Sequence, residues 1–174
     1  MFLNPTQVLS ELQLPAKPRI GDFGAGAGHY SLALAKRYGP YAEIYAFDAL
    51  PGAIDSLRKE ADVYASPFYG LVSDLNERIP VASNVLNAGI VANTLHQLTD
   101  KARFVSELSR VLKPESPVLV VDWARSDNNF GPPASAVITP GEAVRLFRSA
   151  GFSAGEMFSA GTHHFAFIAT NHTP

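Results

Sequence analysis

The sequence contains no cysteine among its 174 residues. Disulfide frameworks, cysteine zinc sites, thiol redox chemistry and cysteine nucleophiles are therefore excluded, and the fold must depend on packing. Charged residues are also scarce, at 17% against a typical ~25%, while hydrophobic residues make up 47%. This composition excludes a disordered chain or an acidic tail and predicts a compact protein.

Basic charge is not concentrated anywhere in the sequence. The chain has 14 Lys and Arg residues against 16 Asp and Glu residues, for a net charge of −2. Sequence-independent nucleic-acid binding needs many cations that neutralise phosphates, so we expect no nucleic-acid partner. The two adjacent histidines, His163 and His164, would point to opposite faces of a strand, so we expect no metal site.

Long apolar runs are absent as well. No run approaches the ~18 residues of a membrane span, and residues 1–5 lack the basic and apolar regions of a signal peptide. We therefore expect a cytoplasmic protein with no membrane association. The length predicts one domain, residues 1–174, in which residues 1–18 form an N-terminal helix and a linker.

Strand-like and helix-like stretches alternate along the chain. The expected strands are residues 19–23, 43–47, a stretch within 68–73, 85–91 and 117–122, and the expected helices are residues 30–38, 51–60, one opened by Asp100 and one opened by the Thr139 capping box. Residues 152–158 and 163–170 suggest a terminal β-hairpin. Such alternation predicts an open, mostly parallel α/β sheet with helices on both faces and an antiparallel edge.

A glycine-rich turn lies where the first strand becomes a helix, in Gly24-Ala25-Gly26-Ala27-Gly28. Glycine permits positive φ angles and lets a ligand approach the backbone. The spacing differs from a dinucleotide-binding fingerprint, because the sixth residue is His29, and no Gly-Lys-Ser/Thr follows as in a phosphate-binding loop. A structural turn with no ligand remains the alternative.

Acidic residues close three successive strands of this pattern. Asp22, Asp48 and Asp74 follow one another at intervals of 26 residues. Because the carboxyl ends of parallel strands meet at one edge, we expect these three carboxylates to line one rim. Clustered anions repel phosphates and favour a ligand with hydroxyls, amines or positive charge. A sulfonium nucleoside fits that description.

These residues resemble the motifs of the class I S-adenosylmethionine-dependent methyltransferases, and the similarity extends over roughly residues 5–170. Residues 20–28 resemble the first motif, Asp48 the ribose-binding acid, and Asp74-Leu75 the adenine-binding segment. Residues 87–98 resemble the fourth strand and the turn beside the methyl donor. The resemblance implies a single-domain, Rossmann-like, doubly wound fold with a seven-stranded sheet and an antiparallel C-terminal hairpin.

The resemblance also implies which residues hold the donor. The expected cofactor-binding residues are Asp22, Gly24, Ala25, Gly26, Gly28, Tyr30, Asp48, Ala49, Ser73, Asp74, Leu75, Ala92 and Asn93. The cofactor is then S-adenosyl-L-methionine and its product S-adenosyl-L-homocysteine. Within the superfamily the chain is most similar to small bacterial methyltransferases related to the quinone-biosynthesis group.

Two related groups are disfavoured by missing residues. Arsenite methylation needs thiolates, and the chain has none. The Asn/Asp-Pro-Pro-Tyr signature of adenine methylation is also absent, because the corresponding turn is Ala92-Asn93-Thr94-Leu95.

His96 is the candidate catalytic residue. It follows the fourth strand, where a near-neutral base could deprotonate a hydroxyl or phenol, or it could pack at the start of a helix. Trp123, Arg125 and residues 130–133 follow the fifth strand and are candidates for substrate contact or a lid, or they form a stiff edge loop.

We therefore expect methyl transfer to a small-molecule acceptor by in-line displacement, by a monomer or a homodimer. The alternative is a non-catalytic module that binds S-adenosylmethionine or a partner without transferring a methyl group.

Overall fold

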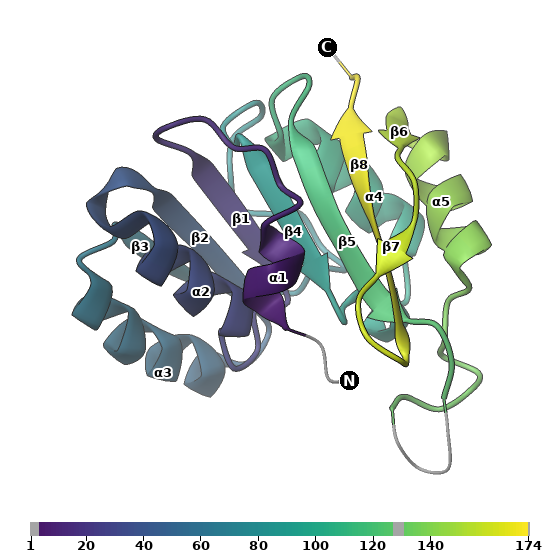
Figure 1. The fold of residues 1–174 in the computed structure, drawn as a ribbon, viewed down its shortest axis with the longest axis horizontal. Helices are drawn as coiled ribbons and strands as arrows, with labels where there is room; N and C mark the ends of the chain where they lie inside the picture. The colour runs from purple at the N-terminus through teal and green to yellow at the C-terminus, as the bar shows by residue number, and fades with distance from the viewer. Residues whose placement is uncertain (1–3, 127–130, 174) are drawn as a thin grey trace.

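A twisted sheet with helices on both faces organises the chain (Figure 1). The computed structural model describes residues 4–126 and 131–173. The helices are α1 (Pro5–Leu9), α2 (His29–Tyr38), α3 (Pro51–Ala61), α4 (Lys101–Val111) and α5 (Pro140–Ser149). The strands are β1 (Arg19–Phe23), β2 (Glu43–Asp48), β3 (Phe68–Val72), β4 (Ala88–Ala92), β5 (Pro117–Trp123), β6 (Phe152–Ala154), β7 (Phe158–Ser159) and β8 (His164–Asn171).

The strand order is β3-β2-β1-β4-β5-β8-β6. The first five strands are parallel, and β8 runs antiparallel to β5. Both β6 and β7 pair with the edge of β8 that faces away from β5, so the two share one strand position and the sheet has seven positions. The expected seven-stranded, mostly parallel sheet with an antiparallel C-terminal hairpin is confirmed. The first arm of that hairpin is interrupted between Ala154 and Phe158.

The fourth strand begins later than the sequence indicates. We expected residues 85–91, but β4 is Ala88–Ala92. The amides of Val85 and Leu86 both donate to the carbonyl of Val111, at 3.0 Å each, so this apolar stretch is held by the end of α4. Hydrophobicity alone does not distinguish a residue that pairs within the sheet from one that packs just before it.

Side-chain caps mark the starts of α1, α4 and α5. The side chain of Asn4 accepts hydrogen bonds from the first turn of α1, and Asp100 accepts one from Arg103 at the start of α4. Thr139 and Glu142 form a reciprocal capping box on α5. These side chains satisfy amides that have no partner within the helix. The caps expected from the sequence are therefore confirmed.

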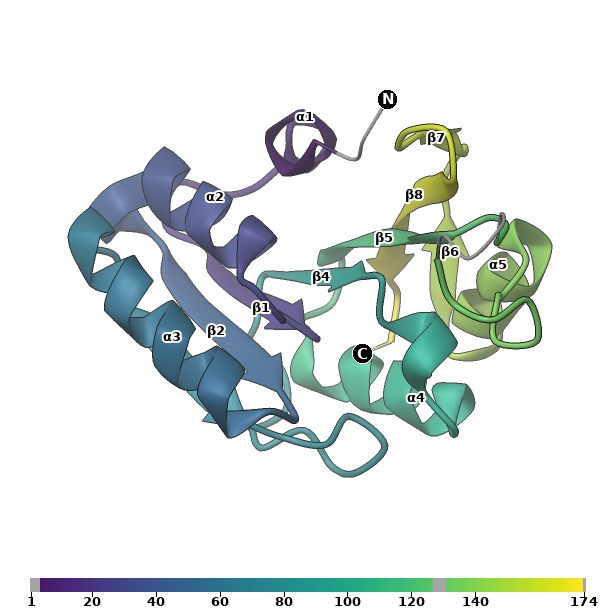
Figure 2. The same ribbon diagram turned by 90° about the horizontal axis from the view of Figure 1, so that it is seen from below.

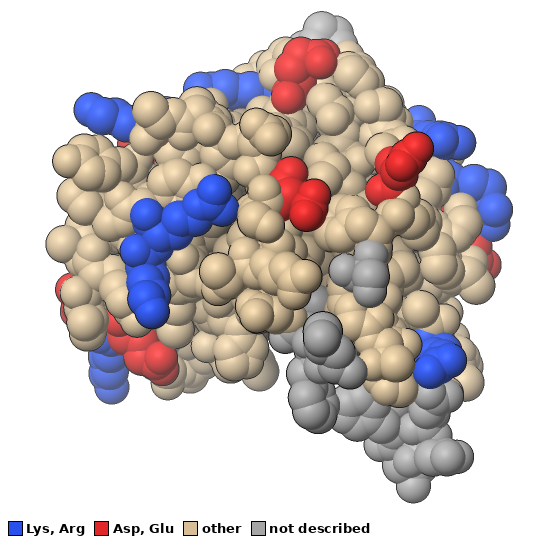
Figure 3. All heavy atoms as spheres, viewed as in Figure 1, with Lys and Arg blue, Asp and Glu red and all other residues tan. Residues whose placement is uncertain are grey.

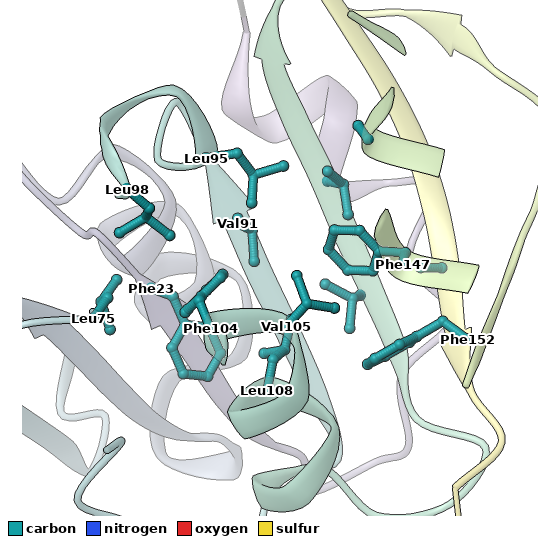
Figure 4. Packing of buried hydrophobic residues seen from close by; sticks show 14 of the residues in the cluster. Phe23, Leu75, Val91, Leu95, Leu98, Phe104, Val105, Leu108, Phe147 and Phe152 are labelled. Atoms are coloured by element: carbon teal, nitrogen blue, oxygen red, sulfur yellow. The ribbon is translucent and has the colours of Figure 1, made fainter. Parts of the chain in front are cut away.

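The helices cover opposite faces of the sheet. Helices α1 and α2 lie in front of the strands in Figure 1 and α4 lies behind them, and Figure 2 shows α1 and α4 on opposite sides. One apolar cluster joins α1 and α2 to the sheet, and a larger one joins α4 and α5 to the other face. Figure 4 shows Phe104, Val105 and Leu108 of α4 beside Phe23 and Val91 of the sheet.

On the face drawn in Figure 3, basic side chains lie next to one another left of the centre and again near the right edge, and acidic side chains lie between these two groups. The face therefore carries both signs of charge, in agreement with the near-neutral net charge of the chain. Within the described residues, no helix is long and apolar enough to cross a membrane.

Candidate functional site

A cavity of about 440 Å³ opens at the carboxyl ends of the parallel strands. Strand β1 pairs with β2 on one side and with β4 on the other, so the strand order reverses there. Ligands of open α/β sheets bind at such a switch point. The cavity is lined by Gly24, Gly26, Asp48, Ala49, Leu50, Ser73, Asp74, Leu75, Asn76, Thr94, Gln97 and Leu98.

The glycine loop after β1 uses its glycines for different purposes. Gly24, Gly26 and Gly28 all have positive φ angles, of 80°, 50° and 78°. A Cβ atom on Gly24 would collide with the side chain of Thr94, and one on Gly28 would collide with Leu57. A Cβ atom on Gly26 would meet nothing closer than a backbone oxygen at 4.0 Å. The backbone of Gly26 is therefore open to a ligand.

Asp48, the last residue of β2, joins the second strand to the glycine loop. Its Oδ2 accepts a hydrogen bond from the amide of Gly26 at 2.8 Å, and its Oδ1 accepts one from the amide of Leu50 at 2.9 Å. An ionised carboxylate has about four acceptor positions. Two backbone amides hold this group in place and leave it able to accept two further hydrogen bonds, as from vicinal hydroxyls.

Asp74 and Asn76 form the third side of the cavity. Asp74 Oδ1 accepts from the amide and the side-chain nitrogen of Asn76, at 2.9 and 3.0 Å. Asn76 Oδ1 accepts in turn from the amide and hydroxyl of Thr99, both at 2.9 Å, which fixes the segment after β3 to the start of α4. Asp74 Oδ2 makes no hydrogen bond within residues 4–126 and 131–173, so it is available to a donor on a ligand.

Asp22 does not join these two carboxylates. It is buried, and its Oδ2 accepts from the amide and the hydroxyl of Ser31, at 3.0 and 2.6 Å. Burial raises the pKa of Asp22 to about 6, although the bonds from Ser31 lower it. Only two of the three expected carboxylates, Asp48 and Asp74, therefore line the cavity. The third, Asp22, is hydrogen-bonded to Ser31 in the first turn of α2.

Tyr30 lies beside this buried group. Burial, and then the negative charge of Asp22, raises the pKa of the Tyr30 hydroxyl. That hydroxyl is buried and has no hydrogen-bond partner among the described residues. Like Asp22, the residues Ala25, Gly28 and Tyr30 do not line the cavity, and their expected contact with the donor stays a prediction.

The turn after β4 faces the cavity through Thr94. The Thr94 hydroxyl lies 2.8 Å from the Phe23 carbonyl and 3.1 Å from the Ala92 carbonyl, so it connects the ends of β1 and β4. Ala92 and Asn93 do not line the cavity. The Asn93 carbonyl accepts from the side chain of Gln97 at 2.7 Å, which positions a residue that does.

His96 belongs to the short 3₁₀ turn η3 (Leu95–Gln97) and contacts the end of β5. Its Nδ1 lies 2.7 Å from Oδ1 of Asp122, whose side chain is fully buried. The pairing becomes visible only when β4 and β5 are placed side by side, since Asp122 ends the most apolar strand of the sequence. Thr94 and Gln97, the neighbours of His96 in the turn, line the cavity.

The sequence motifs identified Gly24, Gly26, Asp48, Ala49, Ser73, Asp74 and Leu75 of the cavity lining. The expected cofactor-binding residues did not include five further lining residues. Leu50 and Asn76 adjoin the motifs in sequence, and Thr94, Gln97 and Leu98 lie within residues 87–98, the segment expected beside the methyl donor. Of the loop after β5, Trp123 and Arg125 do not line the cavity, and Gly131 packs against the Trp123 ring. Phe130, also a candidate there, lies outside the described residues. Within the described chain, no group of three His, Asp or Glu residues is arranged to hold a metal ion.

The lining fits S-adenosylmethionine better than a phosphorylated nucleotide. It offers two carboxylates with free acceptor positions and an open backbone at Gly26, but no Lys or Arg side chain. Leu50 is 66% exposed at the rim, where a bound ring system could cover its side chain. An acceptor-rich, partly apolar site without cations suits a positively charged nucleoside with hydroxyl groups.

Comparison with solved structures identifies the fold. A crystal structure of an S-adenosylmethionine-dependent methyltransferase from Aquifex aeolicus is similar with a TM-score of 0.88 and 27% sequence identity, over 98% of this chain and 90% of that one.

Curated relatives are similar over part of their length. The 2-phytyl-1,4-naphtoquinone methyltransferase of Trichormus variabilis is 29% identical over 62% of this chain and 47% of its own length. The ubiquinone/menaquinone biosynthesis C-methyltransferase UbiE of Bordetella parapertussis is 30% identical over 66% of this chain and 44% of its own length. The chain thus spans about half the length of these relatives.

The family described as methyltransferase domain matches residues 21–120, which is more than half of the chain. This range includes every residue of the cavity lining. The chain therefore belongs to the methyltransferase domain family, and it is a class I S-adenosylmethionine-dependent methyltransferase domain.

Proposed function

We propose that this protein transfers the methyl group of S-adenosylmethionine to a small-molecule acceptor. The observation that carries the proposal is the cavity at the β1/β4 switch point, where Asp48 is held by two backbone amides and keeps free acceptor positions. Asp48 would bind the ribose hydroxyls, Asp74 and Leu75 the adenine, and the open backbone at Gly26 the methionine part. When bound, the sulfonium supplies a carbon attached to a good leaving group.

For in-line displacement at that carbon, the main task of the protein is to align the acceptor with the methyl group. Holding two reactants in a reactive geometry can supply ~7–11 kcal/mol of the barrier. The elements around the cavity are suited to alignment, because the sheet places Asp48 and Asp74 and because Thr94 connects the ends of two strands. No redox or hydrolytic chemistry is required of the chain.

We further propose an aromatic acceptor of the quinol kind. The relatives from Trichormus variabilis and Bordetella parapertussis are named for methylation in quinone biosynthesis. The net charge of −2 gives little attraction for a polyanion, which favours a small molecule over nucleic acid. The protein would act as a monomer or a homodimer.

The experiment is transfer of label from methyl-tritiated S-adenosylmethionine to a panel of hydroquinones, phenols and amines. Labelled product with at least one small acceptor, and none with tRNA or DNA, is expected. Binding of S-adenosylhomocysteine without transfer to any member would favour the non-catalytic binding module instead. Failure to bind S-adenosylhomocysteine would contradict both functions.

A further inference from the structure

The ring of His96 is oriented by a buried carboxylate. Nδ1 of His96 lies 2.7 Å from Oδ1 of Asp122, which is 0% exposed. Asp122 also accepts from the amide of Trp123 at 2.7 Å and from the amide of His96 itself at 3.3 Å. An ionised carboxylate can only accept hydrogen bonds, so the ring nitrogen that faces it, Nδ1, is the one that donates and carries the proton. The lone pair of the neutral imidazole is then on Nε2.

Nε2 of His96 is the ring nitrogen that Asp122 leaves open. His96 itself does not line the donor cavity, but it lies in η3 next to Gln97 and near Thr94, which both line it, and its side chain is 12% exposed. Within the described residues no hydrogen bond is made to Nε2. A ring clamped at one nitrogen and open at the other is the arrangement that a general base requires.

The neighbouring histidine of β8 does not compete for Asp122. His164 pairs with Trp123 across β5 and β8, and the centres of their rings are 4.3 Å apart. Burial is the largest influence on the pKa of His164 and lowers it; the charge of Asp122 raises it, and those of His163 and His96 lower it further. His164 therefore stays neutral near pH 7, and within the described residues it makes no hydrogen bond to Asp122. The charged or titratable groups that influence His164 are Asp122 from β5, His163, which precedes β8, and His96 from η3.

We propose that His96 is the general base of the methyl transfer and takes the proton of an aromatic hydroxyl on the acceptor, with Asp122 as its positioning residue. The inference rests on the proposed function and adds the proton acceptor and the acidic group of the substrate. Phenols ionise near pH 10, so most of the acceptor would be neutral at pH 7 without a base. General base catalysis typically contributes about 10²–10⁴-fold.

The proposed step balances in atoms and charge. The hydroxyl proton moves to Nε2 of His96 while the oxygen, or the ring carbon conjugated with it, forms a bond to the methyl carbon. The methyl–sulfur bond breaks and its electron pair stays on sulfur, which gives a neutral thioether. For attack by carbon, that carbon then loses its proton and the ring oxygen regains one. In either case one proton passes from His96 to solvent.

The test uses the full chain with 1,4-naphthohydroquinone under anaerobic conditions, and compares the wild type with His96→Gln and Asp122→Asn. The wild-type kcat should rise with pH to a plateau, because only an unprotonated imidazole can accept the proton. His96→Gln should lower kcat about 10²–10³-fold and remove this pH dependence. Asp122→Asn should lower it by a similar factor, because an amide can donate to Nδ1 and place the ring proton on Nε2.

A second histidine–carboxylate pair in the same chain provides the control. Nδ1 of His172 lies 2.8 Å from Oε1 of Glu115, but both side chains are exposed and lie near the opposite end of β8. His172→Gln and Glu115→Gln should change neither kcat nor its pH profile. Imidazole in the buffer should restore part of the activity of His96→Ala, a rescue that a purely structural role would not allow.

Two measurements separate the possible failures. Isothermal titration with S-adenosylhomocysteine should give the same affinity, within about twofold, for the wild type, His96→Gln and Asp122→Asn. Long-range ¹H–¹⁵N spectra of the histidine rings should show His96 protonated at Nδ1 in the wild type and at Nε2 in Asp122→Asn, without any acceptor.

Each negative result has a distinct meaning. Loss of wild-type S-adenosylhomocysteine binding would overturn the proposed function itself. Normal binding with no methylation of 1,4-naphthohydroquinone would overturn the aromatic hydroxyl as acceptor. Turnover with an unchanged pH profile in both variants, or an Nε2-protonated ring in the wild type, would overturn the role of His96 and Asp122.

Discussion

The Asp48 carboxylate accepts a hydrogen bond from the Gly26 amide at 2.8 Å, which joins the end of β2 to the loop that follows β1. Asp48 supplies the carboxylate that can accept hydrogen bonds from hydroxyls of a ligand, and Gly26 supplies the open backbone. Because the same carboxylate also accepts from the amide of Leu50, one side chain holds both the glycine loop and the segment that leads into α3.

Replacing Asp48 should therefore affect ligand binding strongly. Asp48→Ala removes an acceptor worth ~1.5–3 kcal/mol for each hydrogen bond to a charged group, so S-adenosylhomocysteine affinity should fall on the order of 100-fold. Asp55→Ala is the matched control, since Asp55 is an exposed acid of α3 paired with Arg58. Isothermal titration measures both, and equal affinities for the two variants would contradict the role of Asp48.

Alanine substitutions at Gly26 and Gly52 should have opposite effects on stability, and only the one at Gly26 should affect binding. Gly26 has a φ of 50° and lines the cavity, whereas a Cβ atom on Gly52 in α3 would meet nothing within 4 Å. Gly26→Ala should cost ~1–2 kcal/mol of stability through the left-handed backbone and weaken S-adenosylhomocysteine binding. Gly52→Ala should raise the free energy of unfolding by about 0.5–1 kcal/mol and leave binding unchanged. Urea unfolding and titration would show the difference; the opposite order of stabilities would contradict it.

The raised pKa of Asp22 makes stability depend on pH. The pKa is about 6 in the folded protein and 3.8 without the fold, so the folded state binds the proton more tightly. The contribution of Asp22 to stability is fully present below pH 3.8 and is lost as the pH rises through 6. Over that range the wild type should lose up to ~3 kcal/mol relative to Asp22→Asn.

Urea unfolding of the wild type and Asp22→Asn at matched pH values between about 4 and 8 measures this difference. Other titrating groups cancel in the comparison, and the altered contacts of the amide with Ser31 add a constant offset. Ser31→Ala should shift the pH range of this stability loss to higher pH, because the hydrogen bond from the Ser31 hydroxyl lowers the pKa of Asp22. A difference that does not vary with pH would rule out the buried, shifted carboxyl.

Thr94 should matter through its hydroxyl. It is buried, and its oxygen lies within hydrogen-bonding distance of the carbonyls of Phe23 and Ala92. Thr94→Val leaves a buried carbonyl without its donor and should cost ~1–3 kcal/mol. Thr94→Ser keeps the hydroxyl and should cost less than Thr94→Val. Thermal unfolding of the two variants decides the point, and a larger loss of stability for Thr94→Ser than for Thr94→Val would mean that the methyl group matters instead.

The fold was predictable because its local signals agree with one another. The caps at Asn4, Asp100 and Thr139 and the alternation of strands and helices all favour one open sheet, and the structure has it. The start of β4 was not predictable from the sequence, because the apolar residues Val85 and Leu86 are compatible both with pairing in a strand and with packing against the end of α4. The order of β8 and β6 depends on pairing between distant segments.

The candidate site divides in the same way. Residues whose backbone or carboxylate lies at a strand end, such as Gly26 and Asp48, are placed by the motif itself. Asp22 shares the motif but is covered by Ser31 of the next helix, which only the packed structure reveals. Asp122 pairs with His96 because β5 lies beside β4, a contact between residues 26 positions apart.

The central claim is that the cavity at the switch point binds the nucleoside of S-adenosylmethionine and rejects a phosphorylated one. Isothermal titration of the unmodified protein with S-adenosylhomocysteine and with ATP, side by side, tests it most directly. The account predicts micromolar binding of S-adenosylhomocysteine and no measurable binding of ATP, since the lining has two available carboxylates and no Lys or Arg. Tighter binding of ATP, or no heat with S-adenosylhomocysteine, would contradict it.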